Sequence, residues 1–175
     1  MTLNRFFNIT IVLLLVVPIH AQQYHDAALE EIVGSVKEIV YIKSDFETIC
    51  YDRNGKETKA FESKENRQYD ADGYLVFYEF DSKGMHCTAH VSYDEHHRLK
   101  QHKSIADGGC IIHELVYNKE GYVSQSTVTI EAIDEKRKYK FTYTYLTYDD
   151  IGNWLSRIRK GHRSVEYENR IIRYY

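Results

Sequence analysis

Three stretches of the chain alternate between apolar and polar side chains. In residues 85–93 and 138–145 the odd positions are apolar or aromatic, and the even positions between them are polar. Within residues 36–43, Val36, Val40 and Ile42 would share one face of a strand. Because successive side chains of a β-strand point to opposite faces of a sheet, a period of two predicts strands in all three stretches.

Short polar turns separate the predicted strands. In each, an aromatic residue is followed by Asp or Asn and then, three residues later, usually by Gly. Asp and Asn accept hydrogen bonds from the backbone of a turn, and Gly adopts the positive φ of a type I turn with a bulge. The underlying spacing of roughly 11 to 18 residues predicts a meander of hairpins. The turns occupy residues 51–55, 69–73, 80–84, 93–97, 117–121 and 148–152, of which 93–97 is degenerate because it lacks the Gly.

The first 21 residues differ in character from the rest of the chain. Residues 9–17 are apolar, Pro18 ends the run, and Ala21 offers a small side chain for cleavage. The nine residues of this run are too few to span a bilayer, which takes about 20. Residues 1–21 are therefore predicted to be a cleaved signal peptide. We expect an exported protein, periplasmic or extracellular, that begins near Gln22 and has no membrane span.

The remaining chain divides into a short N-terminal segment and one domain. Residues 22–35 contain the one helical candidate, residues 26–33, for which Asp26 would be the N-cap. Residues 36–175 contain no linker, and their length suits one domain with its own core. We expect an all-β fold. It would be an antiparallel β-meander of repeated hairpins, forming a twisted single layer or a clamshell sheet, with a minor N-terminal helix.

Composition supports strands and restricts the partners. The chain has 16 Tyr and 7 Phe but one Pro, which favours pleated, half-buried surfaces. Its formal net charge is −3, and its basic residues are not clustered as nucleic-acid binding requires, so no nucleic-acid partner is expected. An exported protein can keep disulfides. The odd cysteine count allows one bridge, Cys87–Cys110, or three free thiols that include Cys50; we favour the thiols.

No motif for catalysis or cofactor binding is present. The chain lacks a Gly-x-Ser-x-Gly elbow, a His-Glu-x-x-His motif and a Gly-rich phosphate loop. Carboxylates are abundant, but most belong to turns, so no catalytic pair can be selected. Several histidines could meet in a metal site, but solvent-facing histidines on a sheet are the simpler interpretation. We expect no enzyme, no cofactor and no metal. The histidines in question are His86, His90, His96, His97, His102 and His113.

An aromatic stripe on one predicted strand is the most suggestive feature. If its face is open, it could bind sugar rings or a partner protein, since Tyr combines rigid area with a hydrogen-bonding tip. If the face is covered, it belongs to the core. The candidate binding face consists of Tyr139, Phe141, Tyr143 and Tyr145.

The repeated turns resemble the YD repeats of RHS-like proteins and, more loosely, MORN-like hairpin repeats. The likeness extends to small exported proteins of Bacteroidetes through residues 33–37, the turns, and residues 148–157. It covers most of residues 33–175 and implies a meandering sheet, but it implies no particular activity. The uneven spacing of the turns departs from both families.

These features predict a non-catalytic, exported binding or interaction module of the cell envelope. It would act through the tyrosine-rich face or through exposed sheet edges, which can accept a strand from a partner. The partner would be an envelope protein or a glycan. One alternative is a carbohydrate-binding protein that uses the aromatic face. The other, from a different class, is a metal- or carboxylate-dependent hydrolase.

Overall fold

The computed structural model describes residues 23–42, 47–60 and 63–175; the predicted signal peptide lies outside these ranges. The described part is all-β, as the alternating patterns predict. Twelve antiparallel strands form one open sheet, preceded by one turn of 3-10 helix, η1 (Asp26–Glu30). The strands are β1 (Val36–Tyr41), β2 (Glu47–Tyr51), β3 (Glu57–Lys59), β4 (Glu65–Tyr69), β5 (Leu75–Ser82), β6 (Met85–Tyr93), β7 (Leu99–Ala106), β8 (Gly109–Tyr117), β9 (Val123–Ala132), β10 (Glu135–Tyr148), β11 (Trp154–Lys160) and β12 (Val165–Tyr174).

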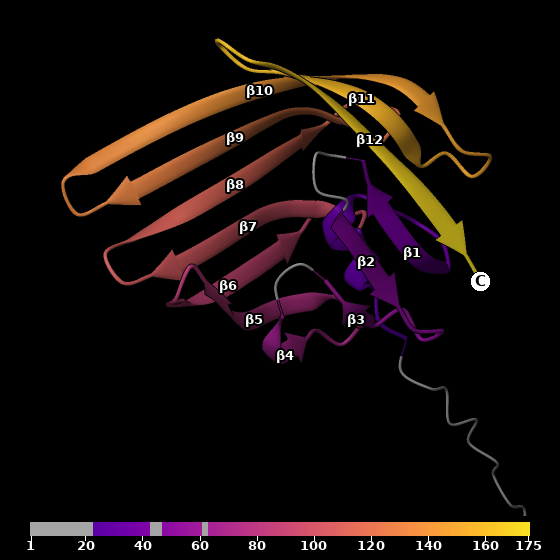
Figure 1. Ribbon diagram of the computed structural model, residues 1–175, viewed down its shortest axis with the longest axis horizontal. Helices are drawn as coiled ribbons and strands as arrows, with labels where there is room; N and C mark the ends of the chain where they lie inside the picture. The colour runs from indigo at the N-terminus through magenta and orange to yellow at the C-terminus, as the bar shows by residue number, and fades with distance from the viewer. Residues whose placement is uncertain (1–22, 43–46, 61–62) are drawn as a thin grey trace, which may run out of the picture.

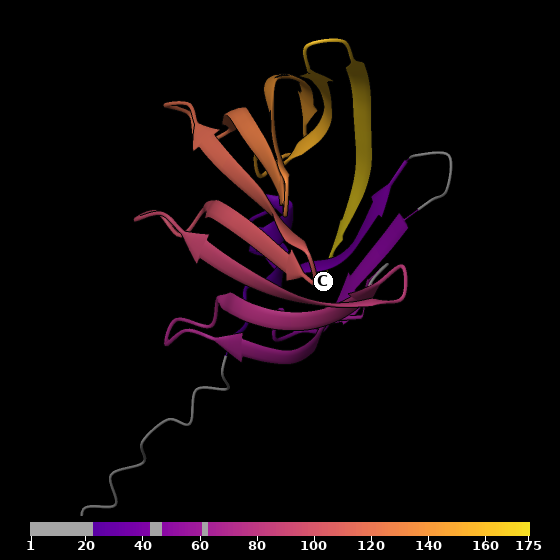
Figure 2. The same cartoon turned by 90° about the vertical axis from the view of Figure 1, so that its left-hand side faces the viewer.

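The strands follow one another through the sheet almost in chain order. From β4 to β12 each strand pairs with the next, and β12 then pairs with β1, which is followed by β2 and β3. The edge strands are β3 and β4, which are neighbours in sequence. Figure 1 shows the sheet arching from β4 to β12 and back to β3, and Figure 2 shows its two halves facing each other. The predicted antiparallel meander is confirmed, and its sheet is curled.

Five turns of the predicted type join strands at one end of the sheet. They occupy residues 51–55, 69–73, 93–97, 117–121 and 148–152. In each, the last N–H donates to the carbonyl of the Asp or Asn at 3.0–3.2 Å. The side-chain Oδ1 of that residue accepts the next N–H along the chain at 2.8–3.0 Å. A shift in strand register accompanies every one, so the predicted combination of turn and bulge is confirmed.

One of the six predicted turns does not form, and another forms without its Gly. Residues 80–84 do not form such a turn, because residues 80–82 belong to β5. Lys83 and Gly84 alone connect β5 to β6, and both have the positive φ that a type I′ hairpin requires. His97, by contrast, takes the glycine position of a complete turn with a φ of 60°. The carboxylate of the Asp therefore organises the turn even where Gly is missing.

Tyrosines beside these turns connect successive hairpins. The Tyr93 hydroxyl donates to the carbonyl of Leu75 at 3.0 Å, and the Tyr117 hydroxyl donates to that of Leu99 at 2.8 Å. Each acceptor is the first residue of the strand that follows the preceding turn. The aromatic residue of the turn signature thus links its own hairpin to the one before it.

The N-terminal helix is shorter than predicted, and its cap differs. It is a 3-10 turn whose N-cap is His25, and no side chain caps it. The prediction of Asp26 as N-cap is wrong because its carboxylate is buried and bonded elsewhere. It accepts a hydrogen bond from the N–H of Glu57 at 2.7 Å. This side chain therefore anchors the N-terminal segment to β3.

Residues 23–25, here called the strap, lie against the turn end of the sheet. Backbone hydrogen bonds join the strap to the turns after β2 and β4. A Cβ placed on Gly55 would lie 2.1 Å from the carbonyl oxygen of Tyr24, and one on Gly73 would lie 2.0 Å from that of Gln23. These two glycines are needed because the strap backbone approaches them too closely for any side chain.

Two apolar clusters lie at the base of the hollow formed by the curled sheet. One gathers buried side chains of strands β5 to β9, and the other joins the N-terminal segment to β1 and β2. Both lie on the face of the sheet that the N-terminal segment covers. The first consists of Leu75, Tyr78, Phe80, Cys87, Ala89, Val91, Leu99, Leu115 and Val123, and the second of Ile32, Val36, Ile39, Ile49 and Tyr51.

The three cysteines are free thiols. Cys87 lies on β6 and Cys110 on β8, with β7 between them. Two strand spacings amount to about 9.5 Å, which exceeds the reach of a disulfide. The interpretation of three free thiols agrees with the structure, and a Cys87–Cys110 bridge does not. Cys87 is buried in the core, and Cys50 is half-buried. Cys110 is also half-buried and lies beside Glu131.

The two edges of the sheet meet at a seam of charged side chains. Arg67 of β4 donates to the carbonyl of Glu57 in β3 at 2.8 Å and pairs with its carboxylate at 3.0 Å. Lys64 pairs with the same carboxylate, and Asp26 lies 3.2 Å from Arg67. Side chains thus satisfy both backbone groups of Glu57. This edge residue is not available to the added strand of a partner.

Candidate functional site

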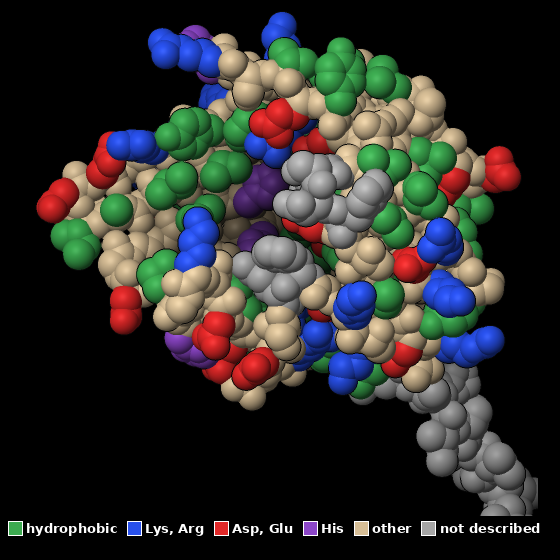
Figure 3. Space-filling model, in the orientation of Figure 1, with side chains coloured by type: hydrophobic (Ala, Val, Ile, Leu, Met, Phe, Trp, Pro, Cys, Tyr) green, Lys and Arg blue, Asp and Glu red, His purple; other side chains and the backbone are tan. Residues whose placement is uncertain are grey.

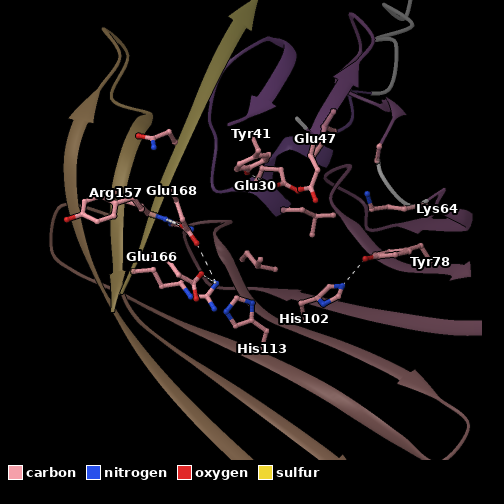
Figure 4. A pocket seen from close by; sticks show the side chains of 17 residues that line it. Glu30, Tyr41, Glu47, Lys64, Tyr78, His102, His113, Arg157, Glu166 and Glu168 are labelled. Atoms are coloured by element: carbon pink, nitrogen blue, oxygen red, sulfur yellow. Dashed lines mark hydrogen bonds and ion pairs between the residues drawn. The ribbon is translucent and has the colours of Figure 1, made fainter. Parts of the chain in front are cut away.

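The hollow side of the sheet holds a cavity of about 680 Å³. Figure 3 looks into its opening, where histidine side chains lie deep in the hollow, and Figure 4 shows its lining from close by. This volume is within the range of small-molecule sites. The lining residues are Leu29, Glu30, Tyr41, Glu47, Ile49, Ala60, Lys64, Tyr78, Leu99, His102, His113, Arg157, Arg159, Glu166, Tyr167, Glu168 and Asn169.

Strand register brings the polar lining together. Cross-strand partners of an antiparallel pair project to the same face of the sheet. His102 of β7 pairs with His113 of β8, and Arg157 of β11 pairs with Glu168 of β12. Each pair turns toward the hollow, so residues far apart in sequence line one cavity (Figure 4).

Arg157 is a fixed cation in the wall of the cavity. Its Nε donates to Glu168 at 2.5 Å, and its Nη1 donates to Glu31 at 2.8 Å. The guanidinium also lies 4.0 Å from the ring centre of Trp154. Burial alone would lower the pKa of Arg157, but Glu31 and Glu168 raise it well above its usual value. Through Nε and Nη1 this arginine holds β11, β12 and the N-terminal segment together.

Arg159 is much less engaged, although it lines the same cavity. Its Nη1 lies 3.5 Å from a carboxylate oxygen of Glu168 and 3.7 Å from one of Glu166, and its guanidinium lies 4.2 Å from the ring centre of Phe141. Arg159 donates no hydrogen bond to any residue that the structure describes, and its buried Nε has no partner among them. Arg159 therefore has hydrogen-bond donors to offer a ligand.

The two cavity histidines are neutral at pH 7. Burial lowers the pKa of His102 to about 4, with smaller contributions from His113 and Lys64. Burial also lowers the pKa of His113, and the positive charge of Arg159 adds to the effect. Nε2 of His102 lies 2.8 Å from the Tyr78 hydroxyl. The ring of His113 has no hydrogen bond within residues 23–42, 47–60 and 63–175.

The opposite side of the cavity is acidic. There the Tyr41 hydroxyl donates to Glu30 at 2.5 Å, and burial raises the pKa of this tyrosine well above its usual value. Glu47 faces the same space as the cross-strand partner of Tyr41. Figure 4 shows this group on the far side of the cavity from His113. Carboxylates therefore line this side of the cavity, and on the other side Glu166 and Glu168 lie beside Arg157 and Arg159.

The predicted aromatic face lies on the hollow side of β10. Tyr143 and Tyr145 are half-buried, and their hydroxyls form hydrogen bonds within the sheet at 2.8 and 2.9 Å. Phe141 lies beneath Arg159, whereas Tyr139 is 42% exposed. The face therefore changes along the strand from core to open wall. Its members are Tyr139, Phe141, Tyr143 and Tyr145.

The arrangement suits ligand binding better than bond cleavage. Glu168 already accepts from Arg157, and Glu30 already accepts from Tyr41. Among the residues that the structure describes, no group of three or more His, Cys, Asp or Glu is placed to hold a metal ion. Paired charges, neutral imidazoles and aromatic rings can together hold a polar group by hydrogen bonds and stacking.

The sequence analysis did not predict the residues that line the cavity. The interpretation of solvent-facing histidines holds for His86 and His96, which are 65% exposed, but fails for His102 and His113. The sequence does contain one indication of the charged lining: charged side chains occupy alternate positions in two successive strands. That signal predicts a charged face but not which face turns inward. The charged positions are Arg157, Arg159, Glu166 and Glu168.

Comparison with known proteins adds no relative. No protein-family model matches the chain, and no curated protein matches it significantly. The resemblance of the turns to YD repeats therefore stays a prediction. As for the membrane, no helix in the described ranges has the length and apolar character needed to cross a bilayer.

Proposed function

We propose that this protein is a non-catalytic, exported binding protein of the cell envelope whose ligand occupies the cavity inside the curled sheet. The observation that carries the proposal is the polar lining of a cavity of about 680 Å³. Burying charged and polar groups costs free energy unless partners satisfy them. A sheet that only needed a core would fill its centre with apolar side chains. The polar lining is thus best explained by a ligand.

The cavity is favoured over the sheet edges as the binding site. The seam between β3 and β4 already satisfies the backbone of Glu57 through Arg67 and Asp26. Natural proteins protect sheet edges with charged side chains in this way. Strand addition at this point would have to break three ion pairs, those of Arg67 and Lys64 with Glu57 and of Arg67 with Asp26.

Carbohydrate binding is the second candidate, and one observation favours it. Tyr139 offers an exposed ring on the hollow side of β10, in line with the half-buried Phe141. Sugar rings stack on such aromatic surfaces, and their hydroxyls can both donate and accept hydrogen bonds. The carboxylates of the acidic wall and the donors of Arg159 would provide both kinds of partner.

Export is supported by the apolar run at residues 9–17 and by Ala21. N-terminal sequencing of the protein from a cell-envelope or culture-medium fraction tests this part of the proposal. We expect the first residue to lie near Gln22. A chain that starts at Met1 and stays in the cytoplasmic fraction would contradict export.

A thermal-shift screen tests the binding function. The purified protein is heated with glycans, amphipathic acids and short peptides, and a ligand specific for the native state stabilises it by about 2.7 kcal/mol at a hundredfold excess over Kd. We expect His113→Trp, which fills the cavity, to abolish the shift, and the exposed control His96→Trp to keep it. If no class of compound raises the Tm, or if His113→Trp leaves the shift unchanged, the cavity is not the binding site.

A further inference from the structure

An exposed apolar wall continues from the polar part of the cavity. Ile111 of β8 pairs with Ile130 of β9, and Val128 pairs both with His113 and with Tyr139. All of these side chains share the hollow side of the sheet, because cross-strand partners and alternate residues point the same way. Ile111, Ile130 and Tyr139 are 48%, 37% and 42% exposed. Figure 3 shows apolar side chains gathered beside the hollow.

The apolar wall and the unpartnered donors meet at one place. His113 lies in the same cross-strand row as Val128 and Tyr139. Among charged residues, Arg159 has the largest effect on the pKa of His113. Arg159 stacks on Phe141, which is two residues along β10 from Tyr139. A ligand that follows the apolar wall into the cavity would therefore meet Arg159 and His113.

We propose that the ligand is an amphipathic anion: a single apolar chain with a carboxylate head. This inference rests on the proposed function and names its substrate class. The head lies against Arg159 and His113 inside the cavity. The tail follows the wall formed by Ile111, Val128 and Ile130 toward the opening.

Charge complementarity decides the sign of the head. Glu30 already has the proton of the Tyr41 hydroxyl as a partner, and Glu168 has the guanidinium of Arg157. Among the described residues that line the cavity, Arg159 has the unsatisfied buried donor, its Nε–H, while its Nη1 makes only longer ion pairs with Glu168 at 3.5 Å and Glu166 at 3.7 Å. A carboxylate would accept from these donors and relieve the burial of an unsatisfied Nε–H.

Calorimetry with four matched probes tests this inference. Decanoate carries the proposed head and tail, decanol lacks the charge, decyltrimethylammonium reverses it, and acetate lacks the tail. All are used below the concentrations at which they form micelles. We expect decanoate to bind roughly tenfold or more tightly than decanol, because a charged hydrogen bond is worth at least that factor. We expect acetate and decyltrimethylammonium to bind more weakly still.

Two pairs of variants assign the head and the tail to their residues. Arg159→Gln should reduce the affinity for decanoate to that for decanol, while Arg163→Gln, the same change on an exposed loop, should leave both unchanged. Ile130→Ser should lower the affinity for decanoate and for decanol about tenfold, because apolar contact with the tail is lost. Its control is Ile133→Ser in the adjacent turn, where the side chain is 85% exposed. The unliganded Tm of each variant reports whether it folds.

The outcomes separate this inference from the proposed function. Equal affinity for decanoate and decanol, or tighter binding of the cation, would overturn the anionic head. If both bind and His113→Trp abolishes both, the cavity is still the site. If a glycan raises the Tm and decanoate does not bind, the ligand class is wrong and the binding function stands. If no compound binds at all, both proposals fail.

Discussion

Single carboxylates organise the turns at one end of the sheet. In the turn after β4, Oδ1 of Asp70 accepts the N–H groups of Asp72 and Tyr74 at 3.0 and 2.9 Å. Gly73 then supplies the positive φ that the backbone needs. The same arrangement recurs with His97 in the glycine position. The Asp is therefore the more important member of the signature.

Replacing Asp70 tests whether its carboxylate stabilises the turn. Asp70→Ala removes two accepted hydrogen bonds and should lower the free energy of unfolding by about 1 to 2 kcal/mol. Asp72→Ala, two residues away in the same turn, should change it by less than about 0.5 kcal/mol. Urea unfolding of both variants measures the difference. Equal effects would show that the carboxylate of Asp70 does not hold the turn.

The half-buried histidine His102 makes the free energy of unfolding depend on pH. Its pKa is about 4 in the folded protein because of burial, against 6.5 when exposed. Above pH 6.5 it is neutral in both states. As the pH falls from 6.5 to about 4, the unfolded chain binds the proton first, so the fold loses stability, on the order of 3 kcal/mol.

Unfolding in urea at pH 7.5 and pH 4.5 measures that loss. His102→Gln, which can still accept from Tyr78, should remove much of the pH dependence across this window. His96→Gln should retain it, because that side chain is 65% exposed. A pH dependence that is the same in His102→Gln and in the unchanged protein would contradict the assignment.

At the scale of elements, the strap depends on two glycines. Gly55 and Gly73 share their turn type and positive φ with Gly121, but only they have a strap carbonyl within about 2 Å of an added Cβ. The strap therefore distinguishes turns that are otherwise alike. Because η1 follows the strap directly, the position of the N-terminal segment depends on this contact.

Alanine substitutions separate the strap contact from the cost of the backbone conformation. Gly55→Ala or Gly73→Ala should destabilise the fold by about 2 kcal/mol more than Gly121→Ala, because all three carry the left-handed strain and only the first two displace the strap. Hydrogen exchange should show faster exchange of the Tyr24 and His25 amides in the first two. Equal destabilisation and equal exchange in all three variants would contradict this role.

The elements themselves are the part that the sequence predicts best. Alternation identifies strands such as β6 and β10, and the aromatic–Asp–x–x–Gly signature locates five turns. Both signals are local, because side-chain periodicity and turn hydrogen bonds involve residues close in sequence. Residues 80–84 carry the same letters but form a different turn, because strand pairing continues through Asp81 to Ser82. A local motif cannot reveal where pairing ends.

The shape of the whole molecule depends on contacts that no local signal encodes. Val36 pairs with Tyr174 across almost the whole length of the chain, and this joins β1 to β12 and curls the sheet. The curl decides which face becomes the interior. The sequence shows alternating charges at Arg157 and Arg159, but the curl alone turns them into the lining of a cavity. The candidate site was therefore less predictable than the strands that carry it.

A ligand that occupies the cavity would contact the histidines in its lining, so the histidines of the chain can report on binding directly. His102 and His113 line the cavity, while His86 and His96 are exposed elsewhere and serve as internal controls. The measurement is an NMR titration of the imidazole resonances with the compound that raises the Tm most.

We predict that the resonances of His102 and His113 move with saturation at the Kd found by calorimetry, while those of His86 and His96 stay in place. If the ligand binds by calorimetry and only the exposed histidines respond, or none does, the ligand binds outside the cavity, contrary to the proposed function.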